Sequence, residues 1–228
     1  MSDWPAGSRG LTVGLRKSRR RDPSSARWLV RQLNDPYVHA AKAQGYRSRA
    51  AFKLRELDGR FRLLRRGQKV LDLGAAPGGW TQVAVAKVGP SGRVVGLDRL
   101  PMEPIPGAVL IRGDLNDPET VSRALAELGG PPDLILSDMA PNTTGHAATD
   151  HLRIVALAEA AARLALDCLA PGGAFVCKVF QGGAEREVLE SLKRAFASVR
   201  HAKPPASRKE SAETYLVAQG FRGRAEEA

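Results

Sequence analysis

The sequence predicts an α/β domain in which helices cover both faces of a mostly parallel sheet. Short, continuous apolar runs alternate with segments of helical periodicity through most of the 228 residues. Apolar runs without polar alternation are typical of strands buried on both faces, as in parallel sheets. A glycine-rich segment, LDLGAAPGGW at 71–80, continues directly from the first run, and acidic residues end the runs that follow. This order is typical of an open sheet that binds a ligand at the carboxyl ends of its strands.

Seven apolar runs are expected to form the strands of the sheet. Most are bounded by glycine, proline or acidic residues, which interrupt regular structure. The run at 214–221 follows the run at 198–204 without an intervening helix, so we expect one antiparallel strand at that end of the sheet. The expected strands are 68–74, 92–98, 108–114, 132–141, 173–180, 198–204 and 214–221.

The segments between these runs carry the helices. Residues 27–64 have a helical pattern, and Ser48 is the expected N-cap of the helix that carries Phe52 and Leu57. Because strands and helices then alternate, we expect further helices at 79–88, 118–129, 149–173 and 184–196.

The chain divides into a polar tail and one domain. Residues 1–24 are rich in glycine, serine and arginine and have no apolar periodicity, which is typical of a disordered segment. Residues 25–228 are numerous enough to form a single domain with its own core, and 25–66 are its basic, helical N-terminal part. We therefore expect a disordered basic tail followed by one domain.

Composition and special residue types argue against several classes of protein. The chain has 43% hydrophobic and 26% charged residues, and no apolar run approaches the roughly 20 residues that span a membrane. The N-terminus lacks the apolar segment of a secretory signal, although its basic character leaves a mitochondrial presequence open. Cys168 and Cys177 have no metal-type spacing and indicate a reduced, cytoplasmic location. The histidines form no ligand pattern, so we expect no metal; they are His39, His146, His151 and His201.

Positive charge is concentrated in the first part of the chain. Residues 1–66 contain 17 Lys and Arg against 5 Asp and Glu, whereas the remainder contains 18 against 19. The net charge of +11 therefore comes entirely from this part. A solvated tail would explain only the first residues, because the positive charge continues into the helical segment at 25–66. A folded basic face beside a neutral domain indicates binding to a polyanion, and nucleic acid is the class that we expect.

The glycine-rich loop at 74–79 suits one kind of ligand better than two others. A loop that binds nucleoside triphosphates needs a Gly-Lys-Ser/Thr end, and a dinucleotide site needs the spacing G-x-G-x-x-G; the sequence supplies neither. An adenosyl ligand whose amino-acid end approaches the glycines is compatible with it. Asp98 and Asp114 end the next two strands, where they could accept hydrogen bonds from ribose hydroxyls and an adenine amino group. One such acid could merely cap a backbone N–H, but a row of them favours a ligand.

Five motifs extend this pattern over nearly the whole chain: DLGAAPGGW, GLDRLPM, GDL, LSDMAPNTTG and CKVFQGG. They resemble the S-adenosylmethionine-dependent RNA 2′-O-ribose methyltransferases of the FtsJ/RrmJ family, from about residue 25 to 220. The resemblance implies a Rossmann-like class I methyltransferase fold with seven strands, the last antiparallel, and S-adenosyl-L-methionine as cofactor. The segments RWLVRQLNDPYVHAAKAQGYRSRAAFKL and KPPASRKESAETYLVA are similar to the bacterial members, which methylate a uridine in the A-loop of 23S rRNA within the large ribosomal subunit.

The resemblance also implies which residues bind the cofactor. Gly78 and Trp80 match positions that line its methionine end, and Asp98 matches the position that holds the ribose. Asp114 matches the position that contacts the adenine, and Asp138 lies beside the methyl group.

A catalytic tetrad is implied in the same way, by Lys53, Asp138, Lys178 and Glu213. A ribose hydroxyl is a weak acid, so the enzyme has to align it with the methyl group and help its proton to leave, which requires no metal. We expect Lys178 to be the general base, with Lys53 lowering its pKa and steering the RNA. Asp138 is expected to orient Lys178, and Glu213 to hold the acceptor ribose or Lys53. Whether the second ammonium or the carboxylates dominate the pKa of Lys178 depends on geometry.

The expected partner is 23S rRNA in the large ribosomal subunit, bound through the basic N-terminal face by a monomer without membrane contact. Two alternatives stay open. The first keeps the chemistry and changes the substrate to tRNA, the mRNA cap or organelle rRNA. The second is a ribosome-assembly factor that binds RNA without catalysis, against which the complete tetrad argues.

Overall fold

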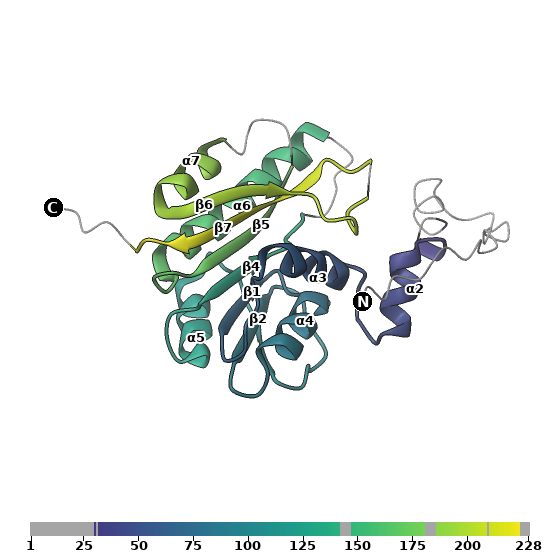
Figure 1. Ribbon diagram of the computed structural model, residues 1–228, viewed down its shortest axis with the longest axis horizontal. Coiled ribbons are helices and arrows are strands. Elements are labelled where there is room, and N and C mark those ends of the chain that lie inside the picture. Colours follow the sequence, from purple (N-terminus) through teal and green to yellow (C-terminus); the bar gives the residue numbers. More distant parts are fainter. Residues whose placement is uncertain (1–29, 31, 142–146, 181–185, 209, 224–228) are drawn as a thin grey trace.

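The computed structural model describes residues 30, 32–141, 147–180, 186–208 and 210–223, and the tail expected at 1–24 lies outside these ranges. One sheet of seven strands forms the centre of the molecule, with helices packed against it (Figure 1). The strands are β1 (Lys69–Leu73), β2 (Arg93–Asp98), β3 (Ala108–Arg112), β4 (Leu134–Ser137), β5 (Ala174–Phe180), β6 (Phe196–Ala202) and β7 (Glu213–Phe221). The helices are α2 (Pro36–Ala43), α3 (Ala50–Phe61), α4 (Gly79–Val88), α5 (Pro118–Leu128), α6 (Ala147–Cys168) and α7 (Arg186–Ala195).

The sheet has the strand order β3-β2-β1-β4-β5-β7-β6. The pairs from β3 to β5 are parallel, whereas β7 is antiparallel to both of its neighbours, β5 and β6. The predicted fold, with seven strands of which one is antiparallel, is therefore confirmed. In the β5–β7 pair, Lys178 lies opposite Tyr215, which brings the end of β5 and the start of β7 to the same edge of the sheet.

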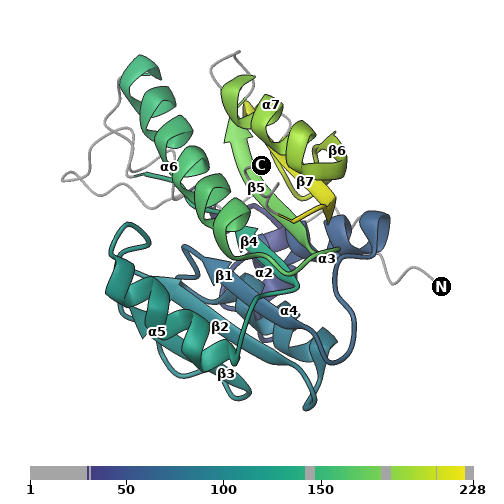
Figure 2. The ribbon, with the colours of Figure 1, turned by 90° about the vertical axis from the view of Figure 1, so that its left-hand side faces the viewer.

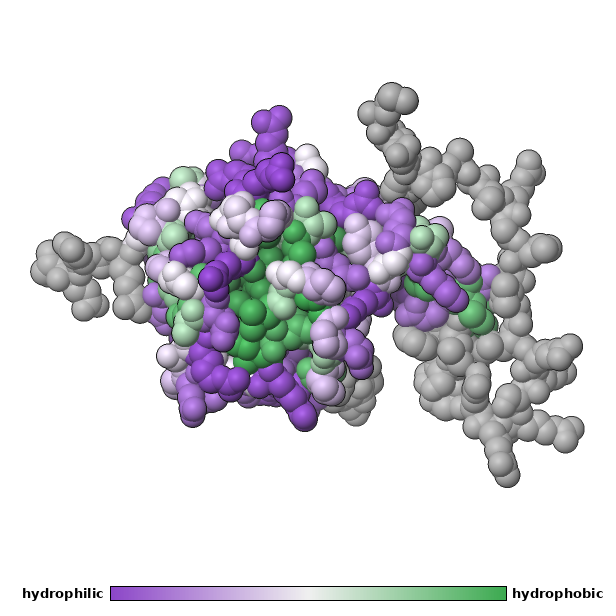
Figure 3. Space-filling model, turned by 90° about the horizontal axis from the view of Figure 1, so that it is seen from below, coloured by the Kyte–Doolittle hydropathy of each residue, from purple (hydrophilic) through white to green (hydrophobic). Residues whose placement is uncertain are grey.

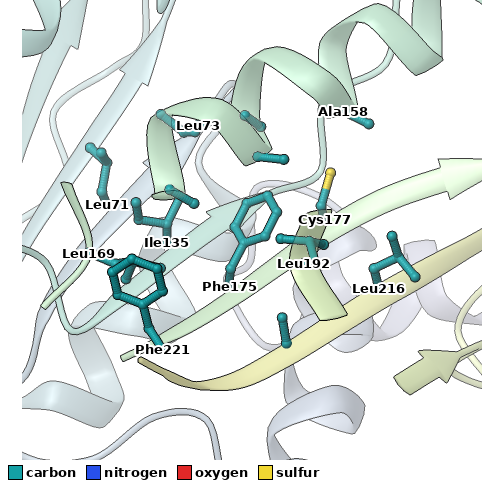
Figure 4. Close-up of a cluster of buried hydrophobic side chains, with 14 of the residues drawn as sticks. Leu71, Leu73, Ile135, Ala158, Leu169, Phe175, Cys177, Leu192, Leu216 and Phe221 are labelled. Atoms are coloured by element: carbon teal, nitrogen blue, oxygen red, sulfur yellow. The ribbon is translucent and has the colours of Figure 1, made fainter. Parts of the chain in front are cut away.

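Each face of the sheet has its own core, because alternate residues of a strand point to opposite faces. Leu71, Ile135 and Phe175 belong to neighbouring strands and pack on one face with α5, α6 and α7. Figure 4 shows part of this cluster, and Figure 2 shows the helices on either side of the sheet. Val70 and Leu134 point to the other face, where α3 and α4 lie. Each fully buried side chain of this kind stabilises the fold by about 1.5–3 kcal/mol.

The helical pattern expected at 27–64 includes two separate helices, α2 and α3. Asp35 caps α2, because its carboxylate accepts a hydrogen bond at 3.0 Å from a backbone N–H of the first turn. Pro36 then fills the first helical position, where a missing N–H costs nothing. After α2, Gly45 has a φ of +72° and turns the chain before α3 begins. These local signals for a start and a stop override the continuous apolar periodicity.

Ser48 is not the N-cap of α3, contrary to the expectation. Arg49 precedes the helix with helical backbone angles and makes no capping hydrogen bond through its side chain. The hydroxyl oxygen of Ser48 is buried without a hydrogen-bond partner among the described residues, and it faces Gly79 at the start of α4. A Cβ on Gly79 would lie 2.4 Å from this oxygen and 3.4 Å from the backbone nitrogen of Ala51, so Ser48 and the start of α3 approach α4 closely at this glycine.

The other helix and strand limits differ from the expected ones by a few residues. Helix α6 begins at Ala147, and β6 follows α7 directly at Phe196. Within the described ranges, no helix has both the length and the apolar character needed to cross a membrane.

Strand β3 lies at one outer edge of the sheet. Figure 3 views the molecule from this side and shows apolar residues gathered at the centre of the face. On β3, Val109 is 39% exposed, and the apolar residues on either side of it are partly exposed. An exposed edge strand offers unpaired backbone groups with which a second chain could pair. The expected monomeric state therefore stays a prediction.

Candidate active site

Glycine and acidic residues line up at the carboxyl ends of four adjacent parallel strands. Gly74 follows β1, Asp98 ends β2, Asp114 follows β3 and Asp138 follows β4. Because the strands are ordered β3-β2-β1-β4, these residues are arranged along one edge of the sheet, as the sequence predicted. This edge is where open α/β sheets bind their ligands.

The loop between β1 and α4 brings bare backbone against its neighbours. Gly74 has a φ of +71°, and a Cβ there would lie 2.3 Å from Cγ of Met139. Gly78 has a φ of +110°, and a Cβ there would lie 2.6 Å from Cδ1 of Ile105. Gly78 is also the N-cap of α4 and has no side chain to bond the first N–H groups of the helix. The N-terminus of α4 therefore has no side-chain cap and favours an anionic group of a ligand, although the N–H of Thr81 already bonds the carboxylate of Asp72.

Both candidate acids for the adenosyl part are held by hydrogen bonds. The carboxylate of Asp98 accepts from the N–H of Ala76, in the glycine loop, at 2.9 Å and from the N–H of Leu100 at 2.8 Å. Asp114 accepts from the backbone N–H of Asn116 at 3.0 Å and from the guanidinium of Arg99. These bonds hold the pKa of Asp114 below its ordinary value. Each carboxylate keeps lone pairs that can accept from a ligand.

Trp80 lies in the core beneath the edge. It is 3% exposed, and its indole N–H donates to the carbonyl oxygen of Ala50 at 2.7 Å. Its ring lies 5.7 Å from the ring of Tyr215, measured between centroids. The structure thus gives Trp80 a packing role, and its predicted contact with the cofactor stays a prediction.

The four residues of the expected tetrad lie together in one cluster. Lys53 Nζ lies 2.8 Å from Oε1 of Glu213 and 3.7 Å from Oδ1 of Asp138. Lys178 Nζ lies 2.7 Å from Oδ1 of Asp138 and 3.6 Å from Oε2 of Glu213. It also donates to the backbone carbonyl of Asp138 at 2.9 Å. Two ammonium groups and two carboxylates therefore alternate in a compact, largely buried arrangement.

Three adjacent strands and one helix position this cluster. Asp138 follows β4, Lys178 lies on its neighbour β5, and Glu213 starts β7 on the other side of β5. Lys178 points to the same face as Val176, two residues earlier, and α3 covers this face. Lys53 therefore reaches the cluster from α3, with its side chain only 11% exposed.

The carboxylates dominate the charge state of the cluster. Burial lowers the pKa of Lys178, but Asp138 and Glu213 outweigh it, so that this pKa is raised above its ordinary value. Burial also opposes the charge on Asp138 and Glu213, yet the two lysines hold the pKa of each carboxyl below its ordinary value. The pKa of Lys178 is therefore raised overall, and the lowering contribution expected from Lys53 stays a prediction. Both carboxylates lie within 3.6 Å of Nζ of Lys178, and Lys178 carries its proton at neutral pH.

Two further residues belong to the cluster and were not predicted from the sequence. The hydroxyl of Tyr215 donates to Oδ1 of Asp138 at 2.6 Å, and burial beside that carboxylate raises the pKa of Tyr215 well above its ordinary value. The hydroxyl of Ser207 donates to Oε1 of Glu213 at 2.7 Å. Tyr215 could have been found, because it lies two residues after Glu213 on one strand and so shares its face. Ser207 lies in a connection and has no such signal.

The connection between β6 and β7 is tied to α3. Ala206 donates its N–H to the Glu56 carboxylate at 2.7 Å, and its carbonyl accepts from the Arg49 guanidinium at 2.6 Å. A cavity of about 300 Å³ lies next to this contact, with Arg49, Ser207 and Arg208 among its lining residues. Since Ser207 also contacts Glu213, the cavity adjoins the cluster.

A third buried carboxyl lies behind the glycine loop. Asp72 on β1 is 1% exposed, and its carboxylate accepts from the Thr81 hydroxyl at 2.6 Å. Burial raises the pKa of Asp72 to about 7, although the Thr81 hydroxyl opposes this shift. Among the residues that the structure describes, no group of three or more His, Cys, Asp and Glu side chains is arranged to hold a metal ion.

The strand order, the antiparallel β7, the glycine loop after β1 and the acids along the same edge define a Rossmann-like methyltransferase. The chain belongs to the FtsJ-like methyltransferase family, whose family model matches residues 46–221. The resemblance on which the sequence-based predictions rested is therefore confirmed.

Individual relatives are similar over nearly their whole length. The protein named ribosomal RNA large subunit methyltransferase E of Granulibacter bethesdensis is 63% identical over 218 residues, which cover 96% of this chain and 94% of the relative. The protein of the same name in Acidiphilium cryptum is 61% identical, with 97% and 98% covered. A crystal structure described as a ribosomal RNA methyltransferase from Plasmodium falciparum is 32% identical and has a TM-score of 0.69, covering 78% of this chain and 100% of that one.

Proposed function

We propose that this protein transfers a methyl group from S-adenosyl-L-methionine to the 2′-hydroxyl of a uridine ribose in the A-loop of 23S rRNA. The cluster of Lys53, Asp138, Lys178 and Glu213 beside the glycine loop carries this proposal, because it sets proton-handling groups next to a site for an adenosyl ligand. The relatives named ribosomal RNA large subunit methyltransferase E support the substrate class.

The residues at the edge of the sheet fit the cofactor. The open N-terminus of α4 at Gly78 suits the carboxylate of an amino acid. Asp98 suits the ribose hydroxyls and Asp114 the adenine amino group, since both are acceptors at the ends of the next strands. When bound, the sulfonium of the cofactor supplies an activated methyl group, and Asp138 offers a carboxylate beside that positive charge.

The chain's own task in the reaction is to place and deprotonate the hydroxyl. The new O–C bond forms as the C–S bond breaks, with its electron pair going to sulfur, and the hydroxyl proton has to leave. We assign the proton acceptor to Lys178 in its neutral form, oriented by Asp138. The carboxylates keep a proton on Lys178 in the free protein. They hold it less firmly once a second positive charge is bound beside Asp138.

RNA binding is assigned to the basic part of the chain at 25–66. Within it, α3 supplies Lys53 to the cluster, so the segment that would contact the phosphates also contributes to the reaction centre. The cavity beside Ser207 would offer room for RNA next to the cluster, and it is lined by Arg49 and Arg208, which also pair with Asp35. Guanidinium groups suit RNA phosphates by charge and geometry. A monomer acting in the cytoplasm, without metal, completes the proposal.

A labelling experiment tests this function. Purified protein is incubated with labelled S-adenosyl-L-methionine and either isolated large subunits or free 23S rRNA, and methylated nucleotides are mapped. We expect one 2′-O-methyluridine in the A-loop. Lys178→Ala should abolish labelling while Lys193→Ala, a lysine 51% exposed on α7, should retain it. Labelling of tRNA or cap analogues instead would change the substrate, and binding of RNA without any labelling would favour the assembly-factor alternative.

A further inference from the structure

Arg47 belongs to the basic segment, yet its side chain contacts the loops beside the candidate cofactor site. It lies between α2 and α3, six residues before Lys53. Its Nη1 donates to the carbonyl oxygens of Glu103 at 2.6 Å and Pro77 at 3.3 Å, and its Nη2 donates to that of Pro104 at 2.8 Å. One guanidinium thus joins the glycine loop to the connection between β2 and β3.

The backbone of Arg47 is held as well. Its N–H donates to Oε1 of Gln82 at 2.9 Å, and Nε2 of the same glutamine donates to the carbonyl of Gly45 at 3.0 Å. Gln82 lies on the first turns of α4, directly after the glycine loop. The link between α2 and α3 is therefore fixed to α4 by its backbone and to two loops by one side chain.

The stem of Arg47 also packs on the glycine loop. A Cβ on Gly78 would lie 3.2 Å from Cδ of Arg47 and 2.6 Å from Cδ1 of Ile105. Arg47 and Ile105 therefore close over the bare backbone at Gly78 from the side of the β2–β3 connection. Asp98, the candidate ribose ligand, ends β2 just before this connection. Arg47 consequently contacts both the glycine loop and the residues that follow Asp98.

A phosphate contact is the default role for an arginine in a basic segment, but the bonding of Arg47 argues against it. A guanidinium has five N–H donors, and three of the hydrogen bonds of Arg47 go to backbone carbonyls. These bonds use three of the five N–H groups and direct the guanidinium toward the two loops, so only two N–H groups are left for a phosphate. Lys42, on the last turn of α2, is exposed, so its ammonium group can reach a phosphate from solvent.

We propose that Arg47 is a positioning residue of the cofactor site, which holds the glycine loop and the β2–β3 connection at the spacing that S-adenosyl-L-methionine requires. Arg47 thereby links the segment that carries Lys53 to the cofactor loop. This proposal rests on the proposed function, because it assumes that the glycine loop binds this cofactor. It adds that a residue of the basic face acts on cofactor affinity rather than on RNA affinity.

Cofactor affinity and RNA affinity are measured separately to test it. Calorimetry with S-adenosyl-L-methionine is expected to give an affinity about ten- to hundredfold weaker for Arg47→Ala than for the unchanged protein. Arg47→Lys should give an intermediate loss, because one ammonium cannot bridge both loops. Gln82→Leu should also weaken cofactor binding, and a neutral residue such as Gln82 cannot act through phosphate charge. The KM for the cofactor should rise while the KM for large subunits stays the same.

Lys42→Ala is the matched control for a phosphate contact. Binding of a fluorescent A-loop hairpin without cofactor is followed over a range of salt concentrations. Lys42→Ala should reduce the salt slope by about one, whereas Arg47→Ala should leave it unchanged. The proposal is overturned if Arg47→Ala keeps its cofactor affinity within about twofold or loses salt slope as Lys42→Ala does. If the unchanged protein binds no cofactor, both the proposed function and the role of Arg47 are refuted. If all variants bind the cofactor normally, only the role of Arg47 is refuted. If Arg47→Ala does not fold, Arg47→Lys and Gln82→Leu decide the question.

Discussion

Replacing Asp72 by asparagine is expected to stabilise the protein at alkaline pH and to change its stability little at acidic pH. The carboxyl is fully buried on β1 and has the Thr81 hydroxyl as a hydrogen-bond donor. Burial raises its pKa from 3.8 to about 7, and the nearby carboxylates of Asp138 and Asp98 contribute to the rise. Asparagine has nearly the same shape, can accept from Thr81 and carries no charge.

The size and sign of the effect follow from this difference between the folded and unfolded states. Because the pKa of Asp72 is higher in the folded protein, its stabilising contribution is complete below about pH 4 and is lost as the pH rises through 7. A difference of about three pKa units corresponds to about 4 kcal/mol above pH 8. Between pH 5 and pH 8 the loss is about 2.5 kcal/mol. Asp72→Asn removes this loss.

This pH-dependent loss of stability is measured by urea unfolding. The unchanged protein and Asp72→Asn are compared at pH 5 and pH 8. The free energy of unfolding of the variant, relative to the unchanged protein, should be higher at pH 8 than at pH 5 by about 2.5 kcal/mol. Thr81→Val, which removes the donor to the carboxylate, should enlarge the pH dependence of the otherwise unchanged protein. An equal difference between Asp72→Asn and the unchanged protein at both pH values would refute the reasoning.

Four further predictions concern the candidate site. The methylation rate should rise about tenfold per pH unit from about pH 6 to 9, because the raised pKa of Lys178 leaves little neutral amine at low pH. A flat pH profile of initial rates would rule out Lys178 as the base. Lys178→Arg keeps the positive charge but cannot release its proton, so single-turnover rates should fall about a hundredfold or more with unchanged cofactor affinity. Tyr215→Phe keeps the packing on Trp80 and removes the donor to Asp138, so kcat should fall about tenfold; an unaltered kcat would show that this hydrogen bond does not position Asp138. Gly78→Ala places a Cβ 2.6 Å from Ile105 at positive φ, and urea unfolding should show a loss of about 1–3 kcal/mol.

The sheet and the row of strand-end residues could be predicted because their signals are local. Continuous apolar runs define the strands, and the acids at Asp98, Asp114 and Asp138 follow them directly in the sequence. The limits of the helices within residues 27–64 were harder to predict. The capping carboxylate of Asp35 and the turn at Gly45 decide them, and the apolar periodicity continues across both.

The cluster of lysines and acids could be predicted only in part. Its members were assigned through family resemblance, since α3, β4, β5 and β7 bring Lys53 and Glu213 together from 160 residues apart. The charge of Lys178 depends on distances of 2.7 Å and 3.6 Å to two carboxylates, which no spacing in the sequence gives. Trp80 was assigned to the cofactor through family resemblance, but the first turn of α4 directs its ring inward.

The position of β7 has a consequence for the order in which this protein is made. The strand lies between β5 and β6, although both are synthesised before it. A nascent chain that ends before β7 therefore leaves a gap one strand wide, with two unpaired edges that invite mispairing with other chains. Glu213 and Tyr215 arrive with that strand. Closure of the sheet and completion of the candidate site are thus a single event, and a product of translation that ends before β7 lacks two members of the cluster and exposes unpaired strand edges.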